Sequence, residues 1–204
     1  MTANNAFIEE INRIETPSAK IALENKKGGR TESIYAFIDS QNLNLSVRKD
    51  VINENTGETI YKGWKLDYKR FFIYLKDKFK VDKAFLFIGC VLGNERLYGF
   101  LENTGYKVIY KPTLDYTEGK KRIIKGNVDA ELVLHAMIEF PNYSKAIIVS
   151  GDGDYHCLVE YLEMQNKLLH IIIPNKQKYS SLLRRFSRYF VFVTDLRAKL
   201  EVRN

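Results

Sequence analysis

The sequence has little cysteine, no long apolar run and none of the common catalytic fingerprints, and each shortage excludes a class of protein. Its 204 residues contain 2 cysteines, Cys90 and Cys157, which lie far apart and have no neighbouring His or Cys at the spacing of metal ligands. A zinc site or a disulfide framework is therefore not expected. We interpret both residues as reduced, buried thiols.

Membrane insertion and secretion are not expected either. No apolar run approaches the roughly 20 residues that a membrane-spanning helix requires. Residues 1–13 include Glu9 and Glu10 and lack the charged-then-apolar layout of a signal peptide. We therefore predict a cytoplasmic protein with no membrane partner.

Three common nucleophile and phosphate motifs are missing as well. The chain has no Gly-x-Ser-x-Gly elbow and no Walker phosphate loop. Its Gly151-x-Gly153 pair lacks the third glycine of a dinucleotide fingerprint. The chemistry must therefore be sought in other residues.

The composition that remains is that of a packed globule with a basic surface. Hydrophobic residues make up 45% of the chain, and the formal net charge is +7. A length of 204 residues suits one well-cored domain with a short appendage. The positive charge favours a polyanionic partner such as nucleic acid.

An apolar run that leads directly into two acids is the most informative stretch. Residues 146–149, Ala-Ile-Ile-Val, show no alternation, which is typical of a central parallel strand covered on both faces. Ser150, Asp152 and Asp154 would then lie in a loop at its carboxyl end, where open α/β sheets place their ligands. The intervening glycines permit close approach or positive φ. Capping of the next helix explains one Asp equally well, but it does not require the second.

The rest of the chain alternates between strands and helices. Residues 34–39 repeat the informative pattern, because an apolar strand ends in Asp39 and polar residues follow. Residues 53–62 resemble a hairpin-like insertion, and 113–126 form a polar, basic segment. Further strands are expected at 84–88, 107–110, 168–173 and 190–193, and helices at 67–79, 94–103, 127–139, 155–165 and 179–186. This alternation predicts a three-layer α/β/α sandwich with a central, mostly parallel, Rossmann-like sheet.

Residues 1–32 are predicted to form an N-terminal extension to the domain at 33–204. Apolar residues at positions 7, 8, 11 and 14 have helix-like spacing, and the polar run 24–32 suits a linker. A short docking helix and a disordered tail both fit this pattern. The extension is a candidate site for a protein partner or for self-association.

Asp39, Asp129, Asp152 and Asp154 are predicted to meet at one edge of the sheet. In a doubly wound sheet the first strands of the two halves are neighbours, and the crevice between them is the usual site. The helix near residue 127 begins at the same edge and brings Asp129, although an acid in a first helical turn also favours the helix dipole. Gathered carboxylates repel one another unless a cation neutralises them, and an all-oxygen set suits Mg²⁺ or Mn²⁺. Such an ion supports phosphodiester hydrolysis.

Basic residues follow the same edge of the predicted sheet. Lys125 precedes the Asp129 helix, and Arg184 and Arg185 come after strand 168–173. These groups could track a sugar-phosphate backbone, although a solvated helix face explains any one of them as well. Tyr155 and Tyr179 are candidates either for base stacking or for the core.

Three blocks of the sequence resemble the signature of the NYN domain, in the LabA-like branch of the PIN-like nuclease superfamily. They are Phe37-Ile38-Asp39-Ser40-Gln41-Asn42-Leu43, Lys125-Gly126-Asn127-Val128-Asp129 and Val149-Ser150-Gly151-Asp152-Gly153-Asp154-Tyr155. The resemblance covers residues 33–194 and departs from the family at Ser40-Gln41 and at Tyr155, where Phe is common. It implies a PIN-like fold and metal-dependent ribonuclease chemistry.

The resemblance also implies roles for single residues. Asp39, Asp129, Asp152 and Asp154 would bind the metal and act in catalysis. Asn42 would orient the substrate or a metal-bound water, and Ser150 would help to bind phosphate or shape the turn.

The leading prediction is an endoribonuclease that uses Mg²⁺ or Mn²⁺ to hydrolyse RNA, with Lys125, Arg184 and Arg185 holding the strand. A non-catalytic RNA-binding or regulatory module is the alternative, since LabA-like proteins are also associated with regulation. A metal-dependent phosphatase acting on small molecules is a third reading.

Overall fold

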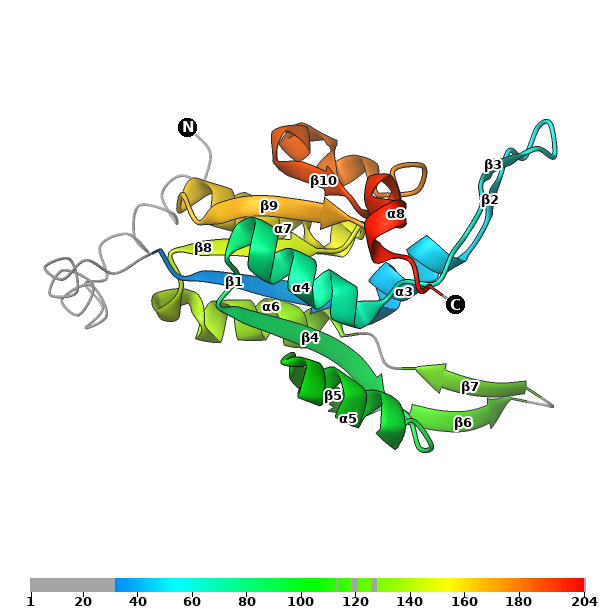
Figure 1. Cartoon of the computed structure of the whole chain (residues 1–204), viewed down its shortest axis with the longest axis horizontal. Helices are drawn as coiled ribbons and strands as arrows, with labels where there is room; N and C mark the ends of the chain where they lie inside the picture. The colour runs from blue at the N-terminus through cyan, green and yellow to red at the C-terminus, as the bar shows by residue number, and fades with distance from the viewer. Residues whose placement is uncertain (1–31, 113, 119–120, 126–127, 204) are drawn as a thin grey trace, which may run out of the picture. The chain divides into compact units, whose positions relative to one another are not determined.

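A six-stranded parallel sheet forms the middle layer of the protein (Figure 1). The computed structural model describes residues 32–112, 114–118, 121–125 and 128–203. The strand order is β10-β9-β8-β1-β4-β5. The strands are β1 (Ile34–Asp39), β4 (Lys83–Cys90), β5 (Lys107–Pro112), β8 (Lys145–Val149), β9 (Leu168–Ile173) and β10 (Phe190–Phe192). The predicted extension at 1–32 lies outside the described residues, apart from residue 32.

The centre of the sheet is the pair formed by β1 and β8. Strand β1 pairs in parallel with β4 on one side and with β8 on the other, and Ile38 lies opposite Val149. The two halves of the chain therefore meet between these strands. The predicted neighbourhood of the strands that carry Asp39 and Asp152 is confirmed.

Helices cover both faces of the sheet, because the strand residues alternate between two apolar cores. Ala36 and Ile38 face a core with α3 (Ser40–Arg48), α4 (Tyr68–Phe79), α5 (Glu95–Thr104) and α8 (Arg197–Leu200). Tyr35 and Phe37 face the other core, with α6 (Asp129–Ile138), α7 (His156–Met164) and the 3₁₀ segment η4 (Ser181–Tyr189). The predicted three-layer α/β/α sandwich is confirmed.

Local sequence explains why the helices begin and end where they do. In α4, Phe71, Leu75 and Phe79 recur at a spacing of four residues and are buried on one face. The Asp67 side chain accepts hydrogen bonds from two backbone amides of the first turn, and Lys80 ends the helix in the left-handed conformation. Within the described part of the chain, every helix is too short or too polar to cross a bilayer.

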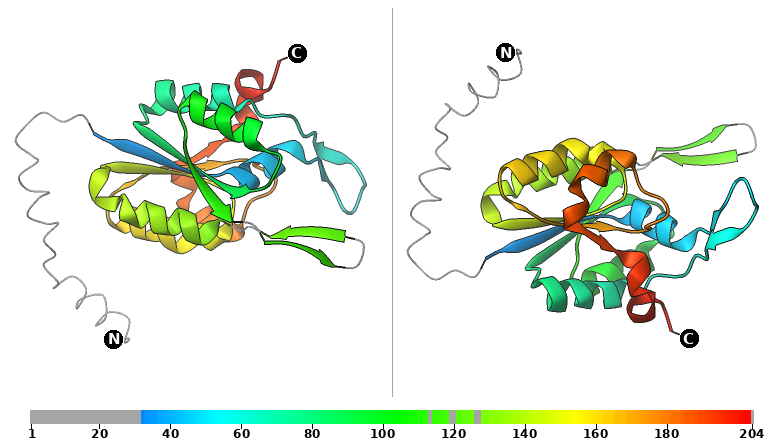
Figure 2. Two further views of the ribbon diagram at one scale, coloured as in Figure 1. Left: turned by 90° about the horizontal axis from the view of Figure 1, so that it is seen from below. Right: turned by 90° about the horizontal axis from the view of Figure 1, so that it is seen from above.

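Two hairpins extend beyond the sheet at the end where the site lies (Figure 2). Strands β2 (Val51–Ile52) and β3 (Thr59–Tyr61) form the expected hairpin-like insertion. Strands β6 (Leu114–Glu118) and β7 (Lys121–Lys125) form a second, antiparallel one. This second hairpin was not predicted, because the segment 113–126 was interpreted only as polar and basic.

Two further expectations were wrong. The predicted helix at 179–186 is the 3₁₀ segment η4, in which Phe186 departs from helical φ and ψ. Cys90 and Cys157 are exposed rather than buried. Cys90 is the last residue of β4, and Cys157 lies in the first turn of α7, outside the buried face formed by Leu158, Val159 and Leu162.

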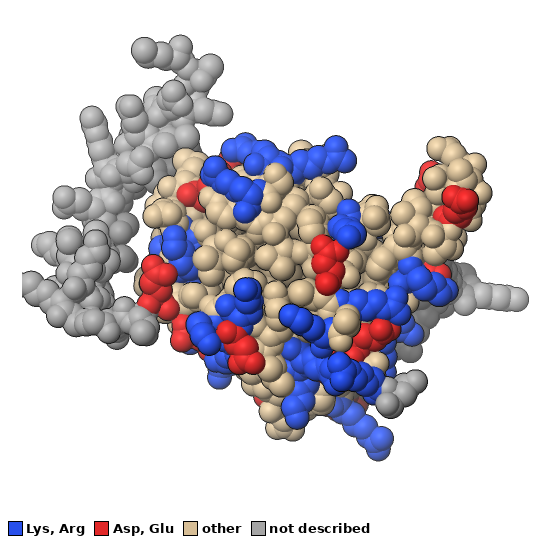
Figure 3. All heavy atoms as spheres, turned by 45° about the horizontal axis from the view of Figure 1, so that its top comes forward, with Lys and Arg blue, Asp and Glu red and all other residues tan. Residues whose placement is uncertain are grey.

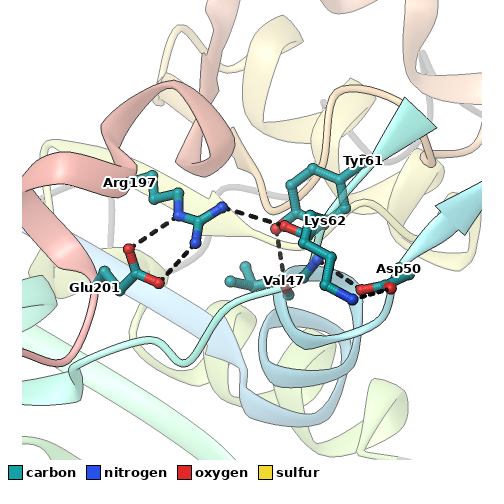
Figure 4. A network of polar contacts seen from close by, with 7 residues as sticks. Val47, Asp50, Tyr61, Lys62, Arg197 and Glu201 are labelled. Carbon is teal, nitrogen blue, oxygen red and sulfur yellow. Dashed lines mark hydrogen bonds and ion pairs between the residues drawn. The ribbon is translucent and has the colours of Figure 1, made fainter. Parts of the chain in front are cut away.

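A polar network ties the carboxyl-terminal helix to the end of α3 (Figure 4). Arg197 makes two contacts of 2.9 Å with the Glu201 carboxylate, and its guanidinium donates to the Lys62 carbonyl at 3.4 Å. The Tyr61 hydroxyl donates to the Val47 carbonyl at 2.6 Å. These contacts hold the segment after β3 against α3, which borders the site.

Candidate active site at the carboxyl ends of β1 and β8

Three of the four predicted carboxylates line one cavity of about 420 Å³ at the centre of the sheet edge. Asp39 ends β1, Asp129 begins α6, and Asp152 lies in the loop after β8. Parallel strands bring their carboxyl ends to one edge, so residues more than a hundred positions apart meet there. Other lining side chains include Gln41, Asn42, Lys49 and Lys178. We call this the acidic cavity.

Asp39 is the most deeply buried of the three carboxylates. Its side chain is only 5% exposed. One carboxylate oxygen, Oδ1, accepts a hydrogen bond of 2.9 Å from the Asn42 backbone amide and so caps α3. Burial raises the pKa of Asp39 above its usual 3.8, and the negative charges of Asp129 and Asp152 add to the rise. The Asn42 and Tyr155 hydrogen bonds oppose it.

The Tyr155 hydroxyl lies between two of the carboxylates. It is 2.6 Å from Oδ1 of Asp129 and 3.2 Å from Oδ2 of Asp39. Burial and the two facing carboxylates raise the pKa of Tyr155 far above its usual range. The phenol therefore stays protonated and acts as a hydrogen-bond donor to the carboxylates. Tyr155 is 1% exposed, which makes it a core residue and leaves no face for base stacking. A Phe at this position could not make these contacts.

The loop after β8 is a tight turn held by its own side chains. Ser150 is 1% exposed, and its Oγ accepts from the Asp152 amide at 3.1 Å. The Asp152 carboxylate accepts from the Asp154 amide at 3.1 Å and caps the 3₁₀ turn η3 (Gly153–Tyr155). Of the two roles expected for Ser150, its contact matches shaping of the turn. The expected capping role of one Asp is also present.

The two glycines of this loop serve close packing. Neither Gly151 nor Gly153 adopts a positive φ. A Cβ on Gly151 would lie 3.2 Å from Cβ of Tyr179, and a Cβ on Gly153 would lie 2.3 Å from Oγ of Ser180. The loop is therefore pressed against the segment that follows β9.

Asn42 joins the two halves of the site. Its side-chain oxygen accepts a hydrogen bond of 2.9 Å from the Gly151 backbone amide, while the Asn42 backbone amide donates to the Asp39 carboxylate. Asn42 thereby fixes the β8 loop relative to β1 and α3. The role that this contact shows is positioning of protein backbone, and contact with substrate stays a prediction.

Asp154, Arg184 and Arg185 are not among the residues that line the acidic cavity. Asp154 is exposed and lies outside the lining. Arg184 and Arg185 are exposed on η4, and Arg185 forms an ion pair of 2.8 Å with Glu160. Lys125 is the last residue of β7, and its side chain lies outside what the structure describes.

The cations that do line the cavity are Lys49 and Lys178, both exposed. Lys178 follows the carboxyl end of β9, the strand beside β8, and is one of the basic residues that the sequence predicts at this edge of the sheet. Lys49 directly follows α3, and only the path of that helix brings it to the cavity. More widely, Lys and Arg stand at several places over the face in Figure 3, with Asp and Glu among them.

The donor chemistry of the acidic cavity suits a hard divalent cation. Its carboxylates supply only oxygen ligands. Burial is the main cause of the raised pKa of Asp39, and a cation would relieve the repulsion from Asp129 and Asp152 that adds to it. In the part of the chain that the structure describes, no three His, Cys, Asp or Glu side chains gather closely enough to ligate one ion. Mg²⁺ commonly binds one or two carboxylates and keeps several waters, so the set fits in that mode.

The parallel sheet and the carboxylates in the crevice at its switch point place this chain among the α/β proteins whose ligand site lies at the carboxyl ends of the strands. A model of the NYN domain matches residues 33–195, and the chain therefore belongs to the NYN domain family. This family has a PIN-like, nuclease-type fold.

Two individual proteins are similar to the chain over most of its length. The "Low amplitude and bright protein LabA" of Synechococcus elongatus is 23% identical, over 84% of this chain and 89% of LabA. A Vibrio parahaemolyticus protein of unknown function, known from its crystal structure, superimposes with a TM-score of 0.63 at 23% identity. That match covers 85% of this chain and 99% of the other, and it shows a shared fold.

Proposed function

We propose that the protein is an endoribonuclease that hydrolyses RNA phosphodiester bonds at the acidic cavity with Mg²⁺ or Mn²⁺. The observation that supports this most directly is the convergence of Asp39, Asp129 and Asp152 from three separate elements on one cavity. Membership of the NYN family adds support, because its fold is of the nuclease type.

The chain's own residues divide the work in this proposal. One or two of Asp39, Asp129 and Asp152 would hold the ion directly and the rest would bind its waters. The chemistry of the ion would be to stabilise charge on the phosphoryl oxygen and to activate water. Lys49 and Lys178 line the same cavity and attract the phosphate of the strand. Asn42 and Tyr155 hold the carboxylates in place through the hydrogen bonds described above. Asp154 lies outside this set.

The test uses the purified full chain and end-labelled single-stranded RNA with Mg²⁺, with Mn²⁺ and with EDTA. We expect cleavage with either metal, none with EDTA, and a loss of activity in Asp152→Asn. The exposed Asp154→Asn is the matched control and should cleave nearly as the wild type does. An inactive wild type across diverse RNAs, with Asp152→Asn indistinguishable from it, would refute the proposal.

A second candidate function is a non-catalytic RNA-binding or regulatory module. The observation that favours it is the Tyr155 hydroxyl, which satisfies Asp39 and Asp129 without a cation. In that case RNA binding depends on Lys49 and Lys178 and is insensitive to EDTA. Charge reversal at both lysines should then abolish binding, whereas Asp39→Asn should leave it intact.

A further inference from the structure

A second cavity lies beside the acidic one, on the other side of Gln41. It has a volume of about 720 Å³ and reaches the carboxyl ends of β1 and β4 at Ser40 and Gly89. Gln41 lines both cavities and is exposed. We call this the α5 cavity, because Leu97 and Phe100 of helix α5 form part of its wall.

The wall of the α5 cavity is apolar and partly aromatic. Leu97 is 40% exposed and Phe100 is 45% exposed, although both are large apolar side chains. Tyr68 and the buried Leu66 also line it. Exposed apolar side chains around a concave surface are the usual lining of a site for a flat organic group. Single-stranded RNA offers such a group in each unstacked base.

Cations and amides complete the lining. Arg48 and Lys65 are exposed and line the cavity. Asp67 is the acid among the lining residues, but its carboxylate accepts from two α4 amides and pairs with Arg70 at 3.3 Å. The positive charges of Arg48 and Lys65 therefore dominate the electrostatic field in the α5 cavity. Asn44 and Asn94 add amide groups of the kind that read base edges.

We propose that the α5 cavity binds one nucleotide of a single-stranded RNA whose neighbouring phosphate lies in the acidic cavity. The apolar wall would take the base, Arg48 and Lys65 the phosphate, and the strand would cross Gln41. Adjacent strands of a sheet lie about 4.8 Å apart, so the ends of β8, β1 and β4 place the two cavities side by side. This inference rests on the nuclease function proposed above.

Binding by the full chain, measured in EDTA so that no strand is cut, tests the subsite separately from catalysis. The probes are fluorescein-labelled hexauridylate and hexaadenylate, followed by anisotropy. Leu97→Ala and Lys65→Ala should each weaken binding by about tenfold, the loss expected when one apolar contact with a base or one phosphate contact is removed. Both side chains are exposed, so truncation should leave thermal melting unchanged.

Matched controls lie away from the cavity. Leu134 is an exposed leucine on α6, on the other face of the sheet, and Lys107 is an exposed lysine at the amino end of β5. Leu134→Ala and Lys107→Ala should bind within about twofold of the wild type, because they remove the same groups where no RNA contact is proposed. Equal weakening by Leu97→Ala and Leu134→Ala would overturn the inference.

Competition by mononucleotides shows whether the α5 cavity binds a nucleotide of an RNA strand or a free nucleotide. Uridine monophosphate and adenosine monophosphate should compete much more weakly than the hexanucleotides, since a single nucleotide cannot reach both cavities. If the mononucleotides competed as strongly as the hexanucleotides, the proposal that an RNA strand spans both cavities would be overturned, and the α5 cavity would be a site for free nucleotides. If RNA is cleaved with metal but the cavity variants bind normally, the subsite fails and the nuclease stands. If the variants weaken binding but no metal supports cleavage, the nuclease fails and the RNA subsite stands.

Discussion

The two cavities that flank Gln41 are built in opposite ways. In the acidic cavity the three carboxylates accept hydrogen bonds from the protein: Asp39 from the Asn42 amide, Asp152 from the Asp154 amide, and both Asp39 and Asp129 from the Tyr155 hydroxyl. The α5 cavity is larger and is walled by apolar side chains such as Leu97 and Phe100, which are 40% and 45% exposed. Chemistry needs fixed groups, whereas recognition of varied bases tolerates movable ones. The contrast fits the proposed division, with reaction in the acidic cavity and base binding in the α5 cavity.

The largest expected effect separates reaction from binding. Asp39→Asn should lower RNA cleavage by about 1000-fold, because it removes a charge worth several kcal/mol of transition-state stabilisation. RNA affinity in EDTA should stay within about twofold, or rise, since one negative charge near the strand is lost. Initial rates and anisotropy on the same preparation measure both quantities. Parallel losses of rate and affinity would break the division between the cavities.

Tyr155→Phe tests how rigidly the acidic cavity is held. In EDTA its unfolding free energy should fall by about 1.5–3 kcal/mol, because a hydrogen bond to a charged group disappears from the core. The loss should shrink when Mn²⁺ is added, if the ion takes over the two carboxylates. Urea denaturation with and without Mn²⁺ measures it.

Tyr143→Phe is the control for this experiment. Tyr143 is 2% exposed, and its hydroxyl donates to the neutral Ala136 carbonyl at 3.0 Å. Its loss should cost about 1 kcal/mol and should not respond to metal. The same metal response in both variants would mean that the Tyr155 hydroxyl has no particular link to the carboxylates.

The pH dependence of stability should also carry the mark of Asp39. Its folded-state pKa is raised above 3.8, mainly by burial, so the folded state binds its proton more tightly than the unfolded state does. The contribution of Asp39 to stability is therefore greatest at low pH and is lost as the pH rises through the folded-state pKa. Asp39→Asn should remove this loss, so the variant gains on the wild type in EDTA as the pH rises above the usual carboxyl pKa of 3.8. Urea denaturation over that range checks it, and a constant difference would contradict it.

Sequence patterns predicted the acidic cavity well because its parts are local. A buried strand, an acid and a loop are adjacent in the chain, as in Val149 to Asp152, and the parallel topology then brings such ends together. The Tyr155 contact could not be predicted in the same way, since a buried Tyr and a buried Phe fit one pattern. Asp154 was placed with the other acids although the turn directs it to solvent.

The α5 cavity could not be read from the sequence at all. Its walls come from α3, the start of α4, the end of β4 and α5, which come together only in the folded chain. No short motif marks it, because Leu97 and Phe100 look like ordinary core positions of an amphipathic helix. The neighbouring elements in the fold decide which apolar side chains of a helix stay uncovered, and the sequence of the helix does not identify those neighbours.

Two glycines give the smallest and most direct comparison of the cavities. Gly153→Ala puts a methyl group 2.3 Å from Ser180 Oγ and should lower the unfolding free energy by about 1–2 kcal/mol, as overpacking does. Gly99 lies in α5, where an added Cβ meets nothing within 4 Å. Gly99→Ala should therefore stabilise the protein by about 0.5–1 kcal/mol through helix propensity. Thermal melts of the two variants distinguish these signs. A tolerated methyl at Gly153 would show that the loop of the acidic cavity is no more tightly built than the helix that walls its neighbour.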